Sequence, residues 1–234
     1  MKGKLWGVGV GPGDSELLTL KAVRLIEECQ VLVVPDSKTR YVALDIAKDA
    51  VKSIDKKEIL KVHMPMTKDK EKLREAHIKA AFAIEQQLDL GKNLVFLTLG
   101  DPTVYSTYYY VHKRVLKDGY NCEIVPGITS FCAAAARLSI SLSEGKDGLY
   151  IMPGSYENIE DGLKVPGTKV IMKSGKSIGK VRDFLVENEH KFKTVMVENC
   201  GMENEKIYDS AGKIQEDASY FSLLIVKDKG EADD

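Results

Sequence analysis

The sequence predicts an α/β protein of two α/β domains with a ligand cleft between them, the first sheet mostly parallel and the second mixed. Short apolar runs alternate with segments of helical periodicity, which is typical of parallel βαβ units. The last apolar runs are separated by segments too short for helical crossovers, so antiparallel pairs are expected among them. The chain has 234 residues, 44% of them hydrophobic, which is enough for one large or two modest cores.

In the first half, strands and helices alternate. Strands are expected at residues 5–10, 31–35, 58–62 and 93–99. Asp14 or Ser15 is the expected N-cap of the first helix, whose buried stripe holds Leu18, Ala22, Leu25 and Ile26. Further helices are expected at 41–52, 68–90 and 105–116.

A hinge is predicted at 117–121, which is polar and contains a glycine. The first domain then spans residues 1–118 and the second residues 121–226. In the second domain we expect strands at 122–125, 148–152, 168–173, 193–198 and 220–226, and helices at 131–138 and 178–188. Residues 227–234 form a charged tail with little reason to be ordered.

Composition excludes several classes of protein. With 34 basic and 35 acidic residues the formal net charge is −1, so we expect no nucleic-acid or anionic-membrane partner. No apolar run approaches the roughly 20 residues of a membrane span, and the start lacks a long signal-peptide core, so a cytoplasmic location is expected. The four cysteines and four histidines are not spaced as metal ligands, so no protein-bound metal is expected.

The most informative stretch is 97–107, where an apolar strand stops at Gly100-Asp101-Pro102. A turn at the carboxyl end of a strand is a common small-molecule site. Gly100 allows close approach to the backbone, and Asp101 places a carboxylate where a cationic sulfonium or amine could bind. The alternative is structural: Asp101 caps the next helix, and Pro102 occupies its first position.

Two further turns have the same character, Val8-Gly-Val-Gly-Pro-Gly-Asp14 and Val125-Pro-Gly-Ile-Thr-Ser130. Together the three turns resemble those of the tetrapyrrole methylases, two-domain enzymes that methylate corrin and sirohaem precursors with S-adenosylmethionine. The resemblance covers nearly the whole chain. The stretches 99–108 and Glu198-Asn-Cys-Gly-Met-Glu-Asn-Glu-Lys-Ile207 look most like the branch that methylates C20 of precorrin-2 or its cobalt complex.

The resemblance implies a homodimeric methyltransferase of cobalamin biosynthesis with S-adenosylmethionine as methyl donor and a tetrapyrrole substrate. The donor contacts that it implies are Pro12, Leu99, Gly100, Asp101, Val104, Thr129, Ser130, Met172 and Cys200. It further implies that the tetrapyrrole lies against Gly9, Gly11 and Gly13. Met172 is equally well explained as a core residue, because methionine in a strand usually packs inside.

Asp101 is the candidate catalytic residue. Methyl transfer is an in-line displacement that needs alignment and a dry cleft rather than a nucleophile from the protein. After attack by C20 its hydrogen must leave, and a nearby base would help. Asp101 could hold the sulfonium, orient the ring nitrogens or accept that proton, and the sequence does not separate these roles.

Three other functions compete with this interpretation. The chain could instead be a methylase of the same family that acts on another ring carbon or on uroporphyrinogen III. It could also be a protein that binds S-adenosylmethionine without catalysis. A nucleotide-binding oxidoreductase is disfavoured, because Pro12 removes an N–H that a phosphate-binding loop uses and Asp36 is only a weak ribose ligand. Whether the substrate already carries cobalt stays open.

Overall fold

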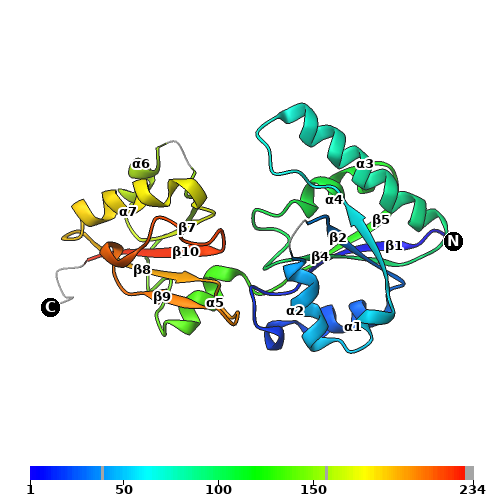
Figure 1. Cartoon of the computed structure of the whole chain (residues 1–234), viewed down its shortest axis with the longest axis horizontal. Helices are drawn as coiled ribbons and strands as arrows, with labels where there is room; N and C mark the ends of the chain where they lie inside the picture. The colour runs from blue at the N-terminus through cyan, green and yellow to red at the C-terminus, as the bar shows by residue number, and fades with distance from the viewer. Residues whose placement is uncertain (38–39, 156–157, 230–234) are drawn as a thin grey trace. The chain divides into compact units, whose positions relative to one another are not determined.

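The computed structural model describes residues 1–37, 40–155 and 158–229 and forms two compact units, Met1–Thr129 and Ser130–Asp234 (Figure 1). The first unit holds a sheet of five parallel strands in the order β3-β2-β4-β1-β5. These are β1 (Lys4–Gly9), β2 (Val31–Pro35), β3 (Glu58–Val62), β4 (Leu94–Thr98) and β5 (Asn121–Val125). The predicted parallel first sheet is confirmed.

Helices cover both faces of this sheet, as Figure 1 shows. On one face lie α1 (Leu20–Glu28) and α2 (Val42–Ala50), and on the other α3 (Lys70–Asp89) and α4 (Tyr108–Lys117). The side chains of β2 alternate between the two cores, with Leu32 facing the first and Val33 the second. The connections that follow β1 and β4 lead to opposite sides of the sheet, from β1 to β2 and from β4 to β5. The carboxyl ends of β1 and β4 therefore form the position where doubly wound sheets bind ligands.

Two helices begin later than the sequence pattern predicts. Asp14 caps only a short 3₁₀ turn, η1 (Ser15–Leu17), and α1 starts after Thr19, whose hydroxyl accepts from the Ala22 N–H at 3.1 Å. The α4 helix starts at Tyr108 rather than at Tyr105, because Tyr105 has a φ of +48°, which no right-handed helix accommodates.

The second unit holds a mixed sheet, as predicted, and its strands lie in the order β6-β7-β10-β8-β9. Its strands are β6 (Leu149–Pro153), β7 (Thr168–Met172), β8 (Phe192–Glu198), β9 (Lys206–Tyr208) and β10 (Ser222–Asp228). β6 and β7 pair in parallel, and the other strand pairs among the described residues of this sheet are antiparallel. One face carries α6 (Ile159–Leu163) and α7 (Ile178–Glu187), and Figure 1 shows α5 (Ser130–Arg137) on the other. Further 3₁₀ turns are η2 (Ile54–Lys56), η3 (Gly175–Ser177) and η4 (Ala211–Lys213).

The boundary between the units differs from the predicted hinge at 117–121. β5 pairs with β1 from Lys4↔Asn121 to Val8↔Val125, so it belongs to the first unit. The polar segment is the ordinary end of α4, where Gly119 at φ +87° donates to the Leu116 carbonyl. At the other end, β10 extends to Asp228 into the predicted tail, and residues 230–234 lie outside the described residues.

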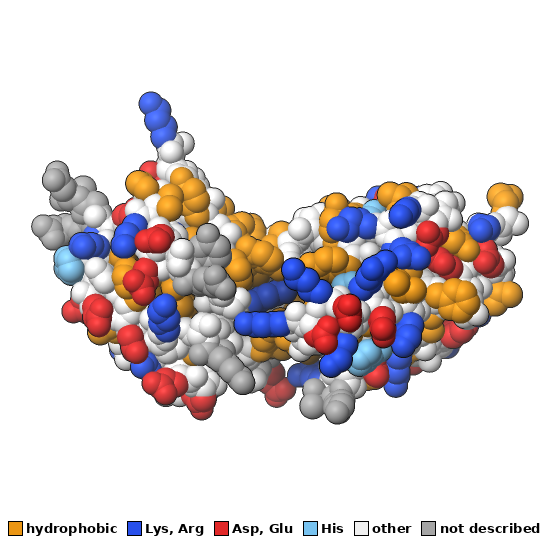
Figure 2. Space-filling view, turned by 90° about the horizontal axis from the view of Figure 1, so that it is seen from above, with side chains coloured by type: hydrophobic (Ala, Val, Ile, Leu, Met, Phe, Trp, Pro, Cys, Tyr) orange, Lys and Arg blue, Asp and Glu red, His pale blue; other side chains and the backbone are white. Residues whose placement is uncertain are grey.

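The surface carries both signs of charge. In the view of Figure 2, Lys and Arg side chains are interspersed with Asp and Glu on the visible face of each unit, with apolar side chains between them. In the described residues, no helix is both long and apolar enough to cross a membrane. The same residues contain no group of three or more His, Cys, Asp and Glu side chains arranged to hold a metal ion.

Candidate functional site

Three turns of the first unit meet at the carboxyl edge of its sheet, because β4, β1 and β5 are neighbours in the sheet. The turn after β1 is bonded to the turn after β4. Val10 donates to the Thr98 carbonyl at 2.9 Å, and Gly100 donates to the Gly11 carbonyl at 2.7 Å. Gly11 and Gly100 thereby form an isolated antiparallel bridge.

Close backbone contact between the three turns requires glycine. A Cβ built on Gly9 would lie 2.5 Å from the Gly100 carbonyl oxygen, and one on Gly127 would lie 2.3 Å from that oxygen. Neither distance is tolerated by a real side chain. Gly100 itself has a φ of +70°, and a Cβ there would meet nothing closer than the Ile128 oxygen at 4.0 Å. The backbone at Gly100 is therefore left approachable.

Asp101 braces two of these turns. Its Oδ1 accepts hydrogen bonds from the backbone N–H of Thr103 at 2.7 Å and from the Thr103 hydroxyl. Its Oδ2 accepts from the Gly127 N–H at 2.9 Å. The residue is 8% exposed. Asp101 does not cap a helix, because α4 begins only at Tyr108; it closes the turn between β4 and α4 and joins it to the turn after β5.

The neighbouring side chains offer polar groups and apolar walls, and Thr98 Oγ1 at the end of β4 is buried without a partner among the described residues. Thr129 Oγ1 is buried and has no hydrogen-bond partner among the described residues. Leu99 and Val104 are half-buried, and Pro12 is buried. Thr129 follows Gly127 in the turn that closes against Gly100, and an unpartnered buried hydroxyl in such a turn is what a ligand with polar groups would complete. The residues of this edge therefore fit a small donor molecule such as S-adenosylmethionine.

Tyr108 supports the edge from the α4 side of the sheet. Its ring lies against Gly7 of β1, where a Cβ would lie 1.9 Å from the ring carbon Cε1. Its hydroxyl lies 3.0 Å from His112 Nδ1. Burial raises the pKa of the Tyr108 hydroxyl and lowers the pKa of His112, so both groups stay neutral near pH 7. The start of α4 is thus fixed against β1.

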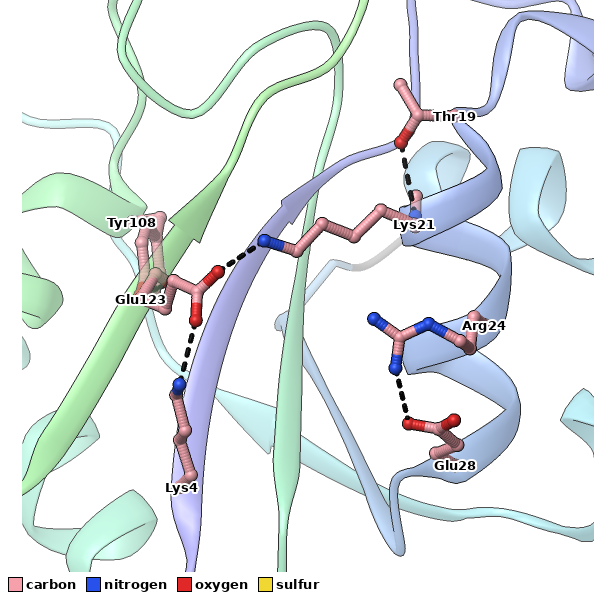
Figure 3. Close-up of polar contacts among 8 residues, drawn as sticks. Lys4, Thr19, Lys21, Arg24, Glu28, Tyr108 and Glu123 are labelled. Carbon is pink, nitrogen blue, oxygen red and sulfur yellow. Dashed lines mark hydrogen bonds and ion pairs between the residues drawn. The ribbon is translucent and has the colours of Figure 1, made fainter.

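Ion pairs secure β5, the edge strand that leads into the Gly127 turn (Figure 3). Glu123 of β5 accepts from Lys21 of α1 and from Lys4 of β1, the latter at 2.7 Å. These two lysines hold the pKa of Glu123 at about 2, well below its ordinary value, and the larger effect comes from Lys21. Figure 3 shows both ammonium groups pointing at the same carboxylate.

The second unit has an edge of the same kind. Met172 ends β7 and lies opposite Leu223, while Glu198 ends β8 and lies opposite Ser222, so both strands end at one edge. The next residues, Lys173 and Asn199, both have φ +53°. Left-handed backbone in residues other than glycine costs free energy and gathers at functional sites.

The predicted site residues divide between the two units. Those in the three turns of the first unit are Gly9, Gly11, Pro12, Gly13, Leu99, Gly100, Asp101, Val104 and Thr129. In the second unit, Met172 and Cys200 share one sheet edge, and Ser130 opens α5. Sequence reasoning missed Gly127 and Thr103, the partners of Asp101; the Pro126-Gly127 pair at a strand end was the available signal.

Comparison with known proteins identifies the family. Residues 4–216 match the family model of the tetrapyrrole (corrin/porphyrin) methylases. The chain belongs to the tetrapyrrole methylases. A probable cobalt-precorrin-2 C(20)-methyltransferase from Methanocaldococcus jannaschii is 36% identical over 231 residues, covering 96% of both chains. A precorrin-2 C(20)-methyltransferase from Sinorhizobium sp is 31% identical over 236 residues, covering 96% of this chain and 95% of that one.

Solved structures of tetrapyrrole methylases share the fold. A cobalt precorrin-4 methyltransferase aligns with a TM-score of 0.76 at 22% identity, covering 96% of this chain and 94% of that one. A uroporphyrin-III C-methyltransferase from Thermus thermophilus, complexed with S-adenosylhomocysteine, aligns with a TM-score of 0.67 at 24% identity, covering 96% and 97%. The family that the three turns indicated and the α/β fold that the alternating pattern predicted are confirmed, and the oxidoreductase interpretation is excluded.

Proposed function

We propose that this tetrapyrrole methylase transfers a methyl group from S-adenosylmethionine to C20 of precorrin-2 or cobalt-precorrin-2 in cobalamin biosynthesis. The observation that carries the proposal is the 36% and 31% identity, over nearly the full length of each chain, to relatives named for that reaction. The brace at Asp101 and the unpartnered Thr129 hydroxyl support it.

For the donor we propose contacts with Pro12, Leu99, Gly100, Asp101, Val104 and Thr129, and from the second unit with Ser130, Met172 and Cys200. When bound, S-adenosylmethionine supplies an electrophilic methyl group on a sulfonium. The Thr129 hydroxyl gains its missing hydrogen bond, and the Gly100 backbone lies against the donor without steric hindrance. Leu99 and Val104 exclude water, which keeps the reacting groups aligned and dry.

Asp101 acts mainly by position and charge in this proposal. Three of the four lone-pair positions of its carboxylate already accept hydrogen bonds from Thr103 and Gly127. One position on Oδ2 remains for a ligand. A buried carboxylate held in this way stabilises nearby positive charge without having to reorient, which favours contact with the sulfonium or with a ring N–H.

The tetrapyrrole substrate is proposed to lie against the turn that contains Gly9, Gly11 and Gly13. Glycine at position 9 serves the packing of this turn, because a Cβ there would lie 2.5 Å from the Gly100 carbonyl oxygen. The finer parts of the proposal are a homodimeric state and a cytoplasmic location, both implied by the resemblance. The proposal includes both the metal-free and the cobalt-bound substrate, because one of the two relatives is named for cobalt-precorrin-2 and the other for precorrin-2.

The test is mass spectrometry of anaerobic reactions with S-adenosylmethionine and either metal-free or cobalt-loaded precorrin-2. Gain of one methyl group on one form supports the proposal and identifies the substrate. Reactions without the donor, or with S-adenosylhomocysteine in its place, are the controls. No methylation of either form, with donor binding intact, would overturn it in favour of another tetrapyrrole or a non-catalytic binding protein.

A further inference from the structure

The loop between β8 and β9 is held in place by polar side chains at its start and by partners in β9 and before β10. Glu198, at its start, accepts from the Tyr208 hydroxyl at 2.9 Å and from the Ser219 N–H at 2.8 Å. Asn199 accepts from the Ser219 hydroxyl at 3.0 Å and donates to the Asn204 carbonyl at 3.4 Å. The hydrogen bonds of Glu198 and Asn199 therefore fix the start of the loop, and those of Asn199 hold its backbone in the left-handed conformation.

Glu205 joins this loop to a helix. Its Oε2 accepts from the Gly201 N–H at 2.9 Å, and its Oε1 accepts from Arg137 Nε at 2.6 Å. Arg137 is the last residue of α5. The Glu205 side chain is only 15% exposed, whereas that of Arg137 is 59% exposed. One carboxylate thus fixes the Cys200–Gly201 turn to the end of α5.

This arrangement exceeds what the connection of two strands requires. Neighbouring antiparallel strands can be joined by about two residues, without any buried charge. Placing a carboxylate at low exposure costs free energy unless both oxygens find donors, as they do here. The two segments that Glu205 joins each carry a proposed donor contact, Cys200 in the turn and Ser130 at the start of α5.

Cys200 itself is suited to contact rather than to attack. Burial, and then the nearby charge of Glu205, raises the pKa of its thiol to about 11, so the thiol stays protonated near pH 7. A neutral thiol is a poor nucleophile but a compact, weakly polar wall for a ligand. The contribution of Cys200 to binding then depends on the position of the turn, and Glu205 fixes that position through the Gly201 N–H.

We propose that Glu205 is a positioning residue: with Arg137 it holds the Asn199–Cys200 turn on α5 and thereby sets the affinity for the methyl donor. The inference rests on the proposed function, since it takes Cys200 and Ser130 as donor contacts. Glu205 does not touch the donor in this proposal. It acts through the Gly201 N–H and the guanidinium of Arg137.

The test is isothermal titration calorimetry of the full chain with S-adenosylhomocysteine. Glu205→Gln and Arg137→Met are expected to raise its Kd about 3- to 30-fold, the range of residues that act through a neighbour. In turnover assays KM for the donor rises while kcat stays within about twofold. Arg137→Lys, which keeps the charge, is expected to recover part of the affinity.

The matched control is Lys213→Met in the same unit, which removes a similarly short pair to Asp209 at 2.8 Å. It is expected to leave the Kd unchanged. Because Arg137 is well exposed, its substitution keeps the fold testable even if Glu205→Gln unfolds. Wild-type Kd in both Glu205 and Arg137 variants, below their unfolding temperatures, would overturn the positioning role alone. Failure of the unsubstituted chain to bind would instead overturn the proposed function, and this inference with it.

Discussion

Replacement of Gly127 by alanine tests the meeting of the three turns. The new Cβ would lie 2.3 Å from the Gly100 carbonyl oxygen and 2.8 Å from Gly9 Cα. Ordinary contacts of a Cβ begin near 3.4 Å, so the turns must separate by roughly an ångström. Both neighbours are backbone, and no flexible side chain is there to move aside.

The cost follows from packing and from hydrogen bonds. Inserting a methyl group into a well-packed region costs about 1–3 kcal/mol. The shift also strains the bond from the Gly127 N–H to Asp101, 2.9 Å long, and a lost hydrogen bond costs about 0.5–1.5 kcal/mol. We expect a loss of about 2–4 kcal/mol in the free energy of unfolding. At 2–4 °C per kcal/mol this lowers Tm by roughly 4–16 °C.

The assay is thermal and urea unfolding, followed by titration with S-adenosylhomocysteine at a temperature where the variant is folded. The control is Gly212→Ala, because a Cβ there meets nothing within 4 Å and its φ is not left-handed. That variant should stay within about 1 kcal/mol of the parent. Gly127→Ala with unchanged Tm and unchanged donor affinity would refute the close contact between the turns.

Three further substitutions test individual contacts. Asp101→Asn turns one acceptor into a donor facing a donor, so urea unfolding should show a loss of about 1–3 kcal/mol, and an unchanged midpoint would contradict the brace. Tyr108→Phe removes the bond to His112 and should cost about 1 kcal/mol by the same assay while sparing donor affinity; lost affinity would contradict its purely supporting role. For Glu123→Gln the loss should be below about 1 kcal/mol at pH 7, since these charges are partly exposed. Because the folded pKa of about 2 lies below the ordinary 4.5, this difference should shrink as pH falls from 4.5 towards 2, and a pH-independent difference would contradict the ion pairs.

Periodicity predicts most of the fold because strands and helices of the first unit are long enough to show it. Val31–Pro35 and Leu94–Thr98 are continuous apolar runs, as expected of strands buried on both faces. The short elements could not be predicted: α6 has one turn, and β9 pairs over only Lys206–Tyr208. The hinge was misplaced since a polar, glycine-bearing segment is equally typical of a helix end, and only the pairing of β5 with β1 decides between them.

The site shows the same limit. Glycines at strand ends predict turns that a ligand can approach, and the strand order brings those turns together. The partner of Asp101 could not be predicted in this way. Asp101 follows β4 and Gly127 follows β5, and β1 lies between these two strands. The hydrogen bond between Asp101 and Gly127 therefore depends on the strand order and on Gly9 and Gly127, which lack the side chains that would keep the turns apart.

Backbone strain gives an independent reason to place function at these edges. Among the described residues other than glycine, left-handed φ angles occur at Tyr105, Ser139, Lys173 and Asn199. Ser139 follows the end of α5, where such a residue closes a helix. Lys173 and Asn199 directly follow the carboxyl ends of β7 and β8, and Tyr105 lies in the turn between β4 and α4. Glycine would relieve the strain at all three positions at no cost to the strands. Retaining side chains there makes sense if those side chains, or the turns they shape, are used for binding.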